Sequence, residues 1–320
     1  MEAGGDDASI FAEITATSTV LGRGEFGVVR RGETAGGPVA VKTVDLAALS
    51  RRDPDCERTL VREIETMRGL AHPHVLRLRG WRRRGSALEL ALEFVAGPEL
   101  AAVVGARGAL DERAARAIGR QLIDAVRYLH ARSVIHRDLK TENVMLAAEV
   151  PDLRRSPLGD PSIKVIDFGL ARRLEAPRPP AAAAAAATPR SWTRAASRRF
   201  RRSISTVGTR GFAPPEIADA GAAPTVTMDD EHAFAIDAFA IGRVLRHVLT
   251  GVSPEKSIME GLADQGVDCG CFVLGKVVRI VPPSALPRDA ADLVARLSRE
   301  DADDRLCLDD ARHHAWFAAP

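Results

Sequence analysis

The chain has 320 residues, 46% of them hydrophobic, so it is long enough to bury one or two substantial cores. Its 45 basic and 43 acidic residues leave a formal net charge of +2, which argues against a domain that binds nucleic acid over its whole surface. The four cysteines are scattered, and the only close pair, Cys269 and Cys271, is a poor zinc site, so we expect reduced thiols in an intracellular protein.

The N-terminal residues 1–7 are acidic and glycine-rich, and they lack the basic and apolar regions of a signal peptide. No apolar run reaches the roughly 18 residues of a membrane-spanning helix. We therefore expect a cytoplasmic protein without membrane contact, although these features do not separate cytosol from nucleus. Residues 1–17 are expected to form a tail before the folded domain.

The folded part begins with two predicted strands, residues 19–21 and 28–32, on either side of a segment containing Gly22, Gly24 and Gly27. The spacing G-x-G-x-x-G also occurs in dinucleotide-binding folds, where the glycines open a helix. A strand follows here instead, so we predict a hairpin. Its glycines allow backbone amides to approach phosphate groups without obstruction by a Cβ atom.

Lys42 ends an alternating strand at residues 39–42, and taken alone it would be a surface lysine. A segment with helical periodicity follows over about residues 53–70. It carries Glu63 and Glu65, which lie about 200° apart around a helix, so both cannot share one face.

Residues 75–78 and 88–95 predict two further strands, and the second leads into a connector at residues 96–98. Beyond it the hydrophobic period changes from two to 3.6. Asp111 is a candidate N-cap for a helix whose apolar stripe runs from residue 117 to 129. The order of strands first and helices later predicts an α+β fold.

The segment 134–143 follows this helix and contains Asp138, Lys140 and Asn143. A carboxylate, a lysine two residues later and an asparagine five residues later suit phosphoryl transfer to a hydroxyl. The acid orients the hydroxyl and accepts its proton, the lysine neutralises the moving group, and the amide carbonyl holds a metal ion. A predicted strand at residues 163–166 then precedes Asp167-Phe168-Gly169.

In this order, the motifs resemble those of the eukaryotic protein kinase domain, Ser/Thr type, over residues 18–317. The resemblance implies a two-lobe fold, with a small, mostly β N-lobe over about residues 18–95 and a larger, mostly helical C-lobe over about 96–317. It also implies ATP and Mg²⁺ as cofactors. The pattern around Glu142 leans toward the calmodulin-dependent and cyclic-nucleotide-dependent groups.

The resemblance also implies site residues. Asp138, Lys140, Lys42 and Glu63 would be catalytic, and Asn143 and Asp167 would hold Mg²⁺. Glu63 is preferred over Glu65 as the partner of Lys42. The residues expected around the nucleotide are Leu21, Gly22, Gly24, Gly27, Val29, Ala40, Lys42, Glu93, Val95, Glu99 and Met145.

Between Asp167 and Glu216 lie about fifty residues, roughly twice the length usual in the family. We expect residues 170–207 to form an extended, disordered activation-loop insertion, because residues 177–189 are low in complexity and rich in Pro and Ala. The arginines between positions 190 and 202 fit a solvated loop; a docking element for an acidic partner or nucleic acid is the alternative. Candidate phosphorylation sites are Ser205, Ser203 and Thr206, and Arg137 would receive the phosphate.

The resemblance further implies three structural contacts. Thr209 would bond Asp138 and Lys140, and Glu216 would pair with Arg305. Asp237 would bind the backbone of the segment 134–143, which corresponds to the catalytic loop of the family.

Together these features imply an ATP-dependent Ser/Thr protein kinase that is regulated by activation-loop phosphorylation. Its expected partners are protein substrates with Arg upstream of the acceptor, bound through Glu99 and Glu142, and an upstream kinase; we expect a monomer. The alternative is a pseudokinase scaffold. Such proteins typically lose the equivalents of Lys42, Asp138, Asn143 or Asp167, and all four are present. Nucleic-acid association through residues 190–202 is a third, less favoured hypothesis.

Overall fold

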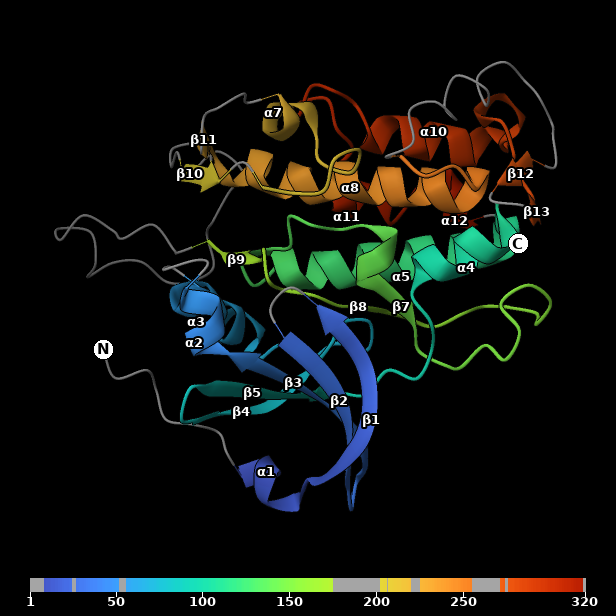
Figure 1. The fold of residues 1–320 in the computed structure, drawn as a ribbon. Helices are drawn as coiled ribbons and strands as arrows, with labels where there is room; N and C mark the ends of the chain where they lie inside the picture. Colours follow the sequence, from blue (N-terminus) through green and yellow to red (C-terminus); the bar gives the residue numbers. More distant parts are fainter. Residues whose placement is uncertain are drawn as a thin grey trace, which may run out of the picture.

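The computed structural model describes residues 9–24, 27–51, 56–174, 202–205, 207–219, 225–254, 271–273 and 276–318. Two lobes lie one above the other in Figure 1, a sheet-rich N-lobe below and a helical C-lobe above. The two-lobe α+β fold expected from the sequence is therefore confirmed.

Within the described residues, the N-lobe contains a five-stranded antiparallel sheet in the order β1-β2-β3-β5-β4. Leu88, Leu90 and Leu92 of β5 are buried on the core face of the sheet, and Ala91 between them is buried as well. Helix α3 covers this core with Leu60 and Ile64. The elements are α1 (Ser9–Glu13), β1 (Thr15–Gly24), β2 (Gly27–Thr34), β3 (Gly37–Asp45), α2 (Leu46–Ser50), α3 (Cys56–Met67), β4 (Leu78–Arg84) and β5 (Ala87–Glu93).

The start of the folded part differs from the prediction. Residues 9–17 are not a tail, because α1 packs Phe11 into the lobe and β1 already begins at Thr15. The Arg82 guanidinium lies 4.3 Å from the centre of the Phe11 ring, a cation–π contact that joins α1 to β4. Residues 1–8 lie outside the described part.

The strand predicted at residues 75–78 is wrong for most of its length. Val75 makes only an isolated bridge with Val165, and β4 begins at Leu78. The segment crosses from α3 to the sheet edge, so the adjacent Val75 and Leu76 are buried without a continuous strand partner. The next strand, β5, ends at Glu93 rather than at Val95.

The connector between the lobes packs tightly against β7. A Cβ atom on Gly97 would lie 2.2 Å from the carbonyl oxygen of Leu146 and 2.3 Å from that of Ala148. Only glycine permits this approach without moving the backbone. The connector thus holds the two lobes together at a fixed point.

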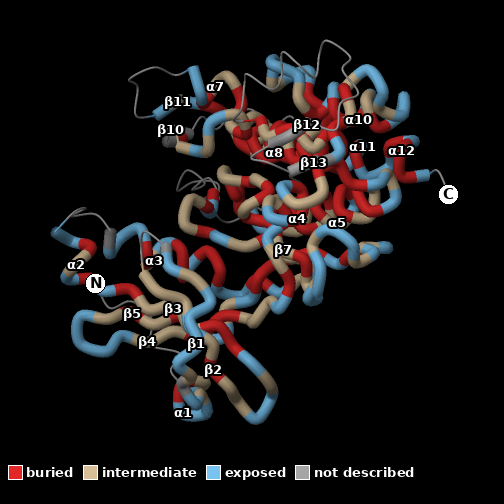
Figure 2. Tube along the Cα trace, turned by 45° about the vertical axis from the view of Figure 1, so that its right-hand side comes forward, coloured by how far each residue is buried: buried red, intermediate tan, exposed pale blue. Residues whose placement is uncertain are grey.

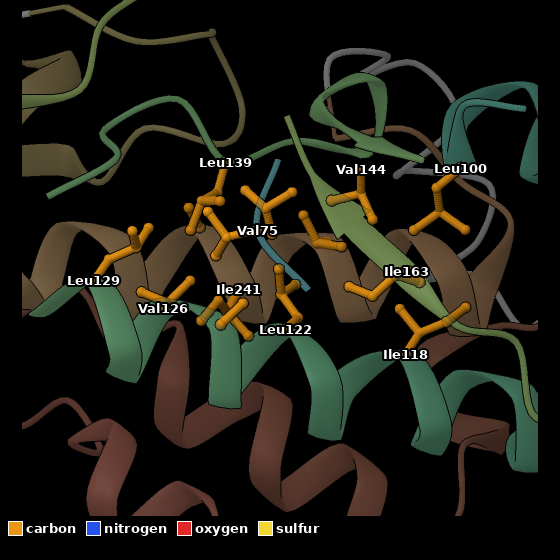
Figure 3. Packing of buried hydrophobic residues seen from close by; sticks show 14 of the residues in the cluster. Val75, Leu100, Ile118, Leu122, Val126, Leu129, Leu139, Val144, Ile163 and Ile241 are labelled. Carbon is orange, nitrogen blue, oxygen red and sulfur yellow. The ribbon is translucent and has the colours of Figure 1, made fainter. Parts of the chain in front are cut away.

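The core of the C-lobe surrounds α5. Asp111 caps this helix by accepting a hydrogen bond of 2.8 Å from the Ala114 N–H, as predicted. In Figure 3, Leu122 and Val126 of α5 lie beside Ile241 of α8, and Ile118 of the same helix lies beside Ile163 of β8. All five side chains are fully buried. Figure 2 shows that buried residues follow α5 and α8 through the lobe, while the surrounding loops are exposed.

The described C-lobe elements are α4 (Leu100–Arg107), α5 (Glu112–His130), β6 (Val134–Ile135), η1 (Thr141–Asn143), β7 (Val144–Leu146), β8 (Ile163–Val165), β9 (Arg172–Arg173), β10 (Arg202–Ser205), α7 (Pro215–Ala218), β11 (Thr225–Met228), α8 (Asp230–Thr250), β12 (Cys271–Val273), β13 (Lys276–Val278), η2 (Pro283–Ala285), α10 (Arg288–Leu297), α11 (Leu308–Ala311) and α12 (Ala315–Ala318). Among the helices described, none combines the length and the apolar character needed to cross a membrane.

The expected disorder of residues 170–207 is wrong at both ends of the insertion. After the Asp167 motif, β9 pairs with β6, so this end is tied to the strand before the catalytic loop. At the other end, β10 pairs with β11, and Ile204 is buried. Residues 175–201 and 206 lie outside the described residues.

Candidate active site

The loop that contains the predicted catalytic residues is fixed to helix α8 by one buried carboxylate. Asp237 accepts hydrogen bonds from the backbone N–H groups of His136 (2.9 Å) and Arg137 (2.8 Å). His130, at the end of α5, contacts the same carboxylate at 2.8 Å. Arg137 has a φ of +67°, an unfavourable conformation for a residue with a side chain, and the bond to Asp237 holds it there. The predicted structural role of Asp237 is confirmed.

Asp138 lies at the centre of a hydrogen-bond network. The Thr209 hydroxyl donates to its Oδ1 at 2.6 Å, and the Thr209 N–H donates to the same oxygen at 3.1 Å. Lys140 Nζ donates to Thr209 Oγ1 at 2.7 Å and lies 3.2 Å from Asp138 Oδ2. Both contacts predicted for Thr209 are therefore confirmed, and one carboxylate oxygen of Asp138 faces a cationic group.

Asn143 and Asp167 come together across the β7–β8 pair. The Ile166 N–H donates to the backbone oxygen of Asn143 at 2.9 Å, directly before Asp167. The Asn143 side-chain Nδ2 donates to the backbone oxygen and to Oδ2 of Asp138, at 2.8 and 3.0 Å, so its amide oxygen is left for another partner. The carboxylate of Asp167 is exposed. An amide oxygen and a carboxylate are ligands that Mg²⁺ prefers, so these residues fit the expected cation.

Lys42 forms the ion pair predicted from the sequence. Its Nζ lies 2.9 Å from Glu63 Oε1, and the Glu63 side chain is only 6% exposed. Glu65 is exposed on another face of α3, which excludes it as the partner. The pair connects β3 to α3 and holds the Lys42 ammonium in place.

The other residues expected at the nucleotide lie on β1, β2 and β3 and beside the connector between the lobes. Gly24 pairs with Gly27 across the β1–β2 turn, as the predicted hairpin requires. A Cβ atom at Gly22 would meet nothing within 4 Å, while Leu21 is 42% exposed. Ala40 of β3 is buried and Val29 of β2 is partly buried, whereas Met145 bridges to Glu99 beyond the connector.

Glu93 makes side-chain contacts that the sequence did not reveal. Lys164 Nζ lies 2.7 Å from Glu93 Oε1, and the Arg77 N–H donates to Oε2 at 3.3 Å. The Glu93 N–H is also occupied, since it donates to the Arg77 oxygen at 2.9 Å. Glu93 therefore joins β5 of the N-lobe to β8 of the C-lobe, just before Asp167. The signal for this pair in the sequence was Lys164, the single charged residue of the otherwise apolar strand β8.

Arg137 belongs to a cluster of arginines. Its Nε donates to the Leu170 oxygen at 2.7 Å. Burial and the positive charges of Arg172 and Arg62 lower the pKa of the Arg137 guanidinium to about 10, against the opposing effect of Asp237. Three segments thus concentrate positive charge beside the catalytic loop.

Two carboxylates, Glu99 and Glu142, lie close together beside the connector between the lobes. Partial desolvation, and then the negative charge of Glu142, raise the pKa of Glu99. Glu99 directly precedes α4, Glu142 lies in η1, and these two elements pack against each other. Together they form a negative patch.

Outside the site, Glu216 and Arg305 form the predicted pair through two short hydrogen bonds of 2.6 and 2.7 Å. The Arg305 side chain is 1% exposed, so this pair is buried between α7 and the C-terminal helices.

Comparison with known proteins gives one matching family model, described as the protein kinase domain, over residues 15–317. Over 93% of its length the chain is 29% identical to the calcium/calmodulin-dependent protein kinase cmkA of Emericella nidulans, and also over 93% it is 32% identical to CBL-interacting protein kinase 4 of Oryza sativa. Over 96% it is 25% identical to the serine/threonine-protein kinase RAD53 of Saccharomyces cerevisiae. The chain spans 60%, 56% and 33%, respectively, of the lengths of these relatives.

Proposed function

Because the chain belongs to the protein kinase family, we propose that it transfers the γ-phosphoryl group of Mg-ATP to Ser or Thr hydroxyls of proteins. The observation that carries this proposal is the network of Asp138, Lys140 and Thr209, whose distances are those of direct hydrogen bonds. The relatives described above are named as kinases, which supports the same activity.

Each group in the network has a chemical task. Asp138 Oδ2 orients the acceptor hydroxyl and takes its proton, while Thr209 holds Oδ1 and so fixes the carboxylate plane. Lys140 stabilises negative charge on the transferred group, and Lys42, held by Glu63, positions the phosphates. Mg²⁺ held by Asn143 and Asp167 would neutralise the phosphate oxygens.

Nucleotide binding provides the test of the proposed cofactors. We expect ATP to bind the wild-type chain more tightly with Mg²⁺ than without it. Asp167→Asn should remove most of this Mg²⁺ dependence, because a neutral amide replaces the charged ligand, while binding without metal stays within about twofold. Isothermal titration with a non-hydrolysable ATP analogue measures the affinity of each protein with and without Mg²⁺. Equal Mg²⁺ dependence in the two proteins would exclude Asp167 as a metal ligand.

The scaffold alternative has little in its favour. Lys42, Asp138, Asn143 and Asp167 are all present, and Lys42 and Asp138 already have the partners that the reaction requires. No observation favours the nucleic-acid hypothesis, since residues 190–201 lie outside the described part and the chain is nearly neutral.

The negative patch of Glu99 and Glu142 supports a preference for substrates with Arg before the acceptor. We expect Glu142→Ala to reduce kcat/KM by about tenfold for peptides with Arg at position −2 or −3, because one charge-assisted contact is lost. For peptides with Ala at these positions, kcat/KM should differ little between Glu142→Ala and the wild type. A peptide panel measured on both proteins tests this; a wild-type enzyme that ignores Arg at both positions would contradict it.

We further propose that phosphorylation of Ser205, Ser203 or Thr206, by the chain itself or by an upstream kinase, regulates the enzyme. The cluster of Arg62, Arg137 and Arg172 supports this, because a phosphate would offset the mutual repulsion of three positive groups. The pairing of β10 with β11 keeps the segment containing Ser203 and Ser205 in the C-lobe.

A further inference from the structure

A hollow of about 360 Å³ lies at the C-terminal end of α4, and none of its described lining residues belongs to the candidate active site. Three segments form it: the end of α4 with the loop that follows, the connector between β7 and β8, and the segment after β13 (Figure 1). Each segment contributes one arginine, namely Arg107, Arg154 and Arg279.

Backbone contacts hold these three segments in place. The Arg279 N–H donates to the Arg107 oxygen at 3.0 Å, and Gly108 bridges to Arg279. Arg107 Nη2 donates to the Ser156 oxygen of the connector at 2.6 Å. Within the connector, Asp152 Oδ1 accepts from the Arg154 N–H at 2.8 Å and so fixes a turn. The backbone of the hollow is therefore ordered before any partner binds.

Positive charge is in excess among the described lining residues, since three arginines face one carboxylate. Arg154 and Arg279 are exposed, and in the described part of the chain neither side chain has a hydrogen-bond or ion-pair partner. The Nε of Arg107 is buried without an acceptor. The carboxylate among the described lining residues, Asp111, accepts a hydrogen bond from the Ala114 N–H at the start of α5. Only Arg107 lies at the end of a helix, and the other two arginines come from other segments. The positive charge of the hollow is therefore not a property of the helix end alone.

The remainder of the lining is apolar. Leu110 is buried and Leu158 packs against the main core, so both present a fixed surface between the arginines. None of the described lining residues is aromatic, so they offer no surface on which nucleic-acid bases could stack.

We propose that this hollow binds an acidic segment of a protein partner, with its carboxylates on the guanidinium groups and an apolar side chain against Leu110 and Leu158. The guanidinium fork matches a carboxylate in geometry as well as charge. Such a contact lies apart from the catalytic residues, so it adds affinity for a partner without altering the transfer step. Binding here does not depend on the proposed phosphoryl transfer.

Fluorescence anisotropy on the full chain tests the proposal, using labelled peptides in which Asp or Glu alternates with Leu. We expect Arg154→Glu/Arg279→Glu to weaken binding by about tenfold or more, because like charges then face each other. Arg107 is left unchanged, since it also holds the connector. The matched control is Arg79→Glu/Arg84→Glu, which makes the same change in net charge at exposed arginines of the N-lobe.

The control should bind these peptides as the wild type does, and both variants should phosphorylate a short neutral peptide at the wild-type rate. Peptides in which Gln replaces each Asp or Glu should bind neither the wild type nor the N-lobe control. Equal loss in both double variants would show a non-specific charge effect and overturn the proposal. Absence of binding by the wild type, or binding of an RNA oligonucleotide in place of the peptides, would also overturn it.

Discussion

Asp138→Asn is expected to lower kcat by about 10²- to 10⁴-fold, the range that general-base catalysis contributes. The amide cannot accept the proton of the acceptor hydroxyl. It also presents an N–H group to Lys140, which lies 3.2 Å from Oδ2 and is itself a donor. The affinity for ATP should remain within about threefold, because Asp138 is expected to contact the acceptor and not the nucleotide. Steady-state kinetics at saturating peptide gives kcat and the KM for ATP.

The matched control is Glu65→Gln, the same change of acid to amide on an exposed face of α3. Its kcat should equal that of the wild type. If Asp138→Asn retained more than about a tenth of the wild-type kcat, general-base catalysis by Asp138 would be contradicted.

Asp237→Ala is expected to destabilise the protein by about 3–5 kcal/mol, the cost of removing one partner of a buried charged network. Asp237 is fully buried and receives the N–H groups of His136 and Arg137, so its loss leaves buried donors without acceptors. The catalytic loop would also lose its connection to α8, and kcat should fall together with stability. Urea unfolding of both proteins at pH 7 measures the difference.

The same carboxylate makes stability depend on pH. Burial alone would raise the pKa of Asp237, but its hydrogen bonds and the nearby charges of His130 and His136 outweigh burial and lower it. A lowered pKa means that the stabilisation is fully present above the pKa of an unfolded aspartate, about 3.9. It is lost as pH falls through the lower pKa of the folded state. The free energy of unfolding of Asp237→Ala should therefore fall less steeply with decreasing pH in this acidic range than that of the wild type. If both proteins lost stability equally steeply there, this contribution of Asp237 would be contradicted.

The catalytic core could be predicted from the sequence because its parts are local. Asp138, Lys140 and Asn143 lie within six residues of one another, so their spacing alone limits their geometry. The Lys42–Glu63 pair was also predictable, since the resemblance supplies the position of each residue and helical periodicity separates Glu63 from Glu65.

Contacts between distant segments could not be predicted in this way. Glu93 and Lys164 are 71 residues apart, and each taken alone is an ordinary charged residue on a strand. The arginines of the hollow come from three segments that only the folded C-lobe brings together. The start of the domain was missed for another reason: α1 has five residues, and a single buried side chain, Phe11, produces no periodic pattern.

Intact-mass measurement after incubation with Mg²⁺ and ATP, beside Asp138→Asn, tests the proposed activity most directly. A generic Ser/Thr peptide substrate is included, and phosphopeptide mapping locates the modified residues. We expect the wild type to phosphorylate the peptide, and itself at Ser203, Ser205 or Thr206, while Asp138→Asn adds no phosphate to either. The variant Ser205→Glu, which supplies the negative charge of a phosphate, is measured as well. If neither the wild type nor Ser205→Glu transferred phosphate to any substrate, the proposal of a Ser/Thr protein kinase would be contradicted.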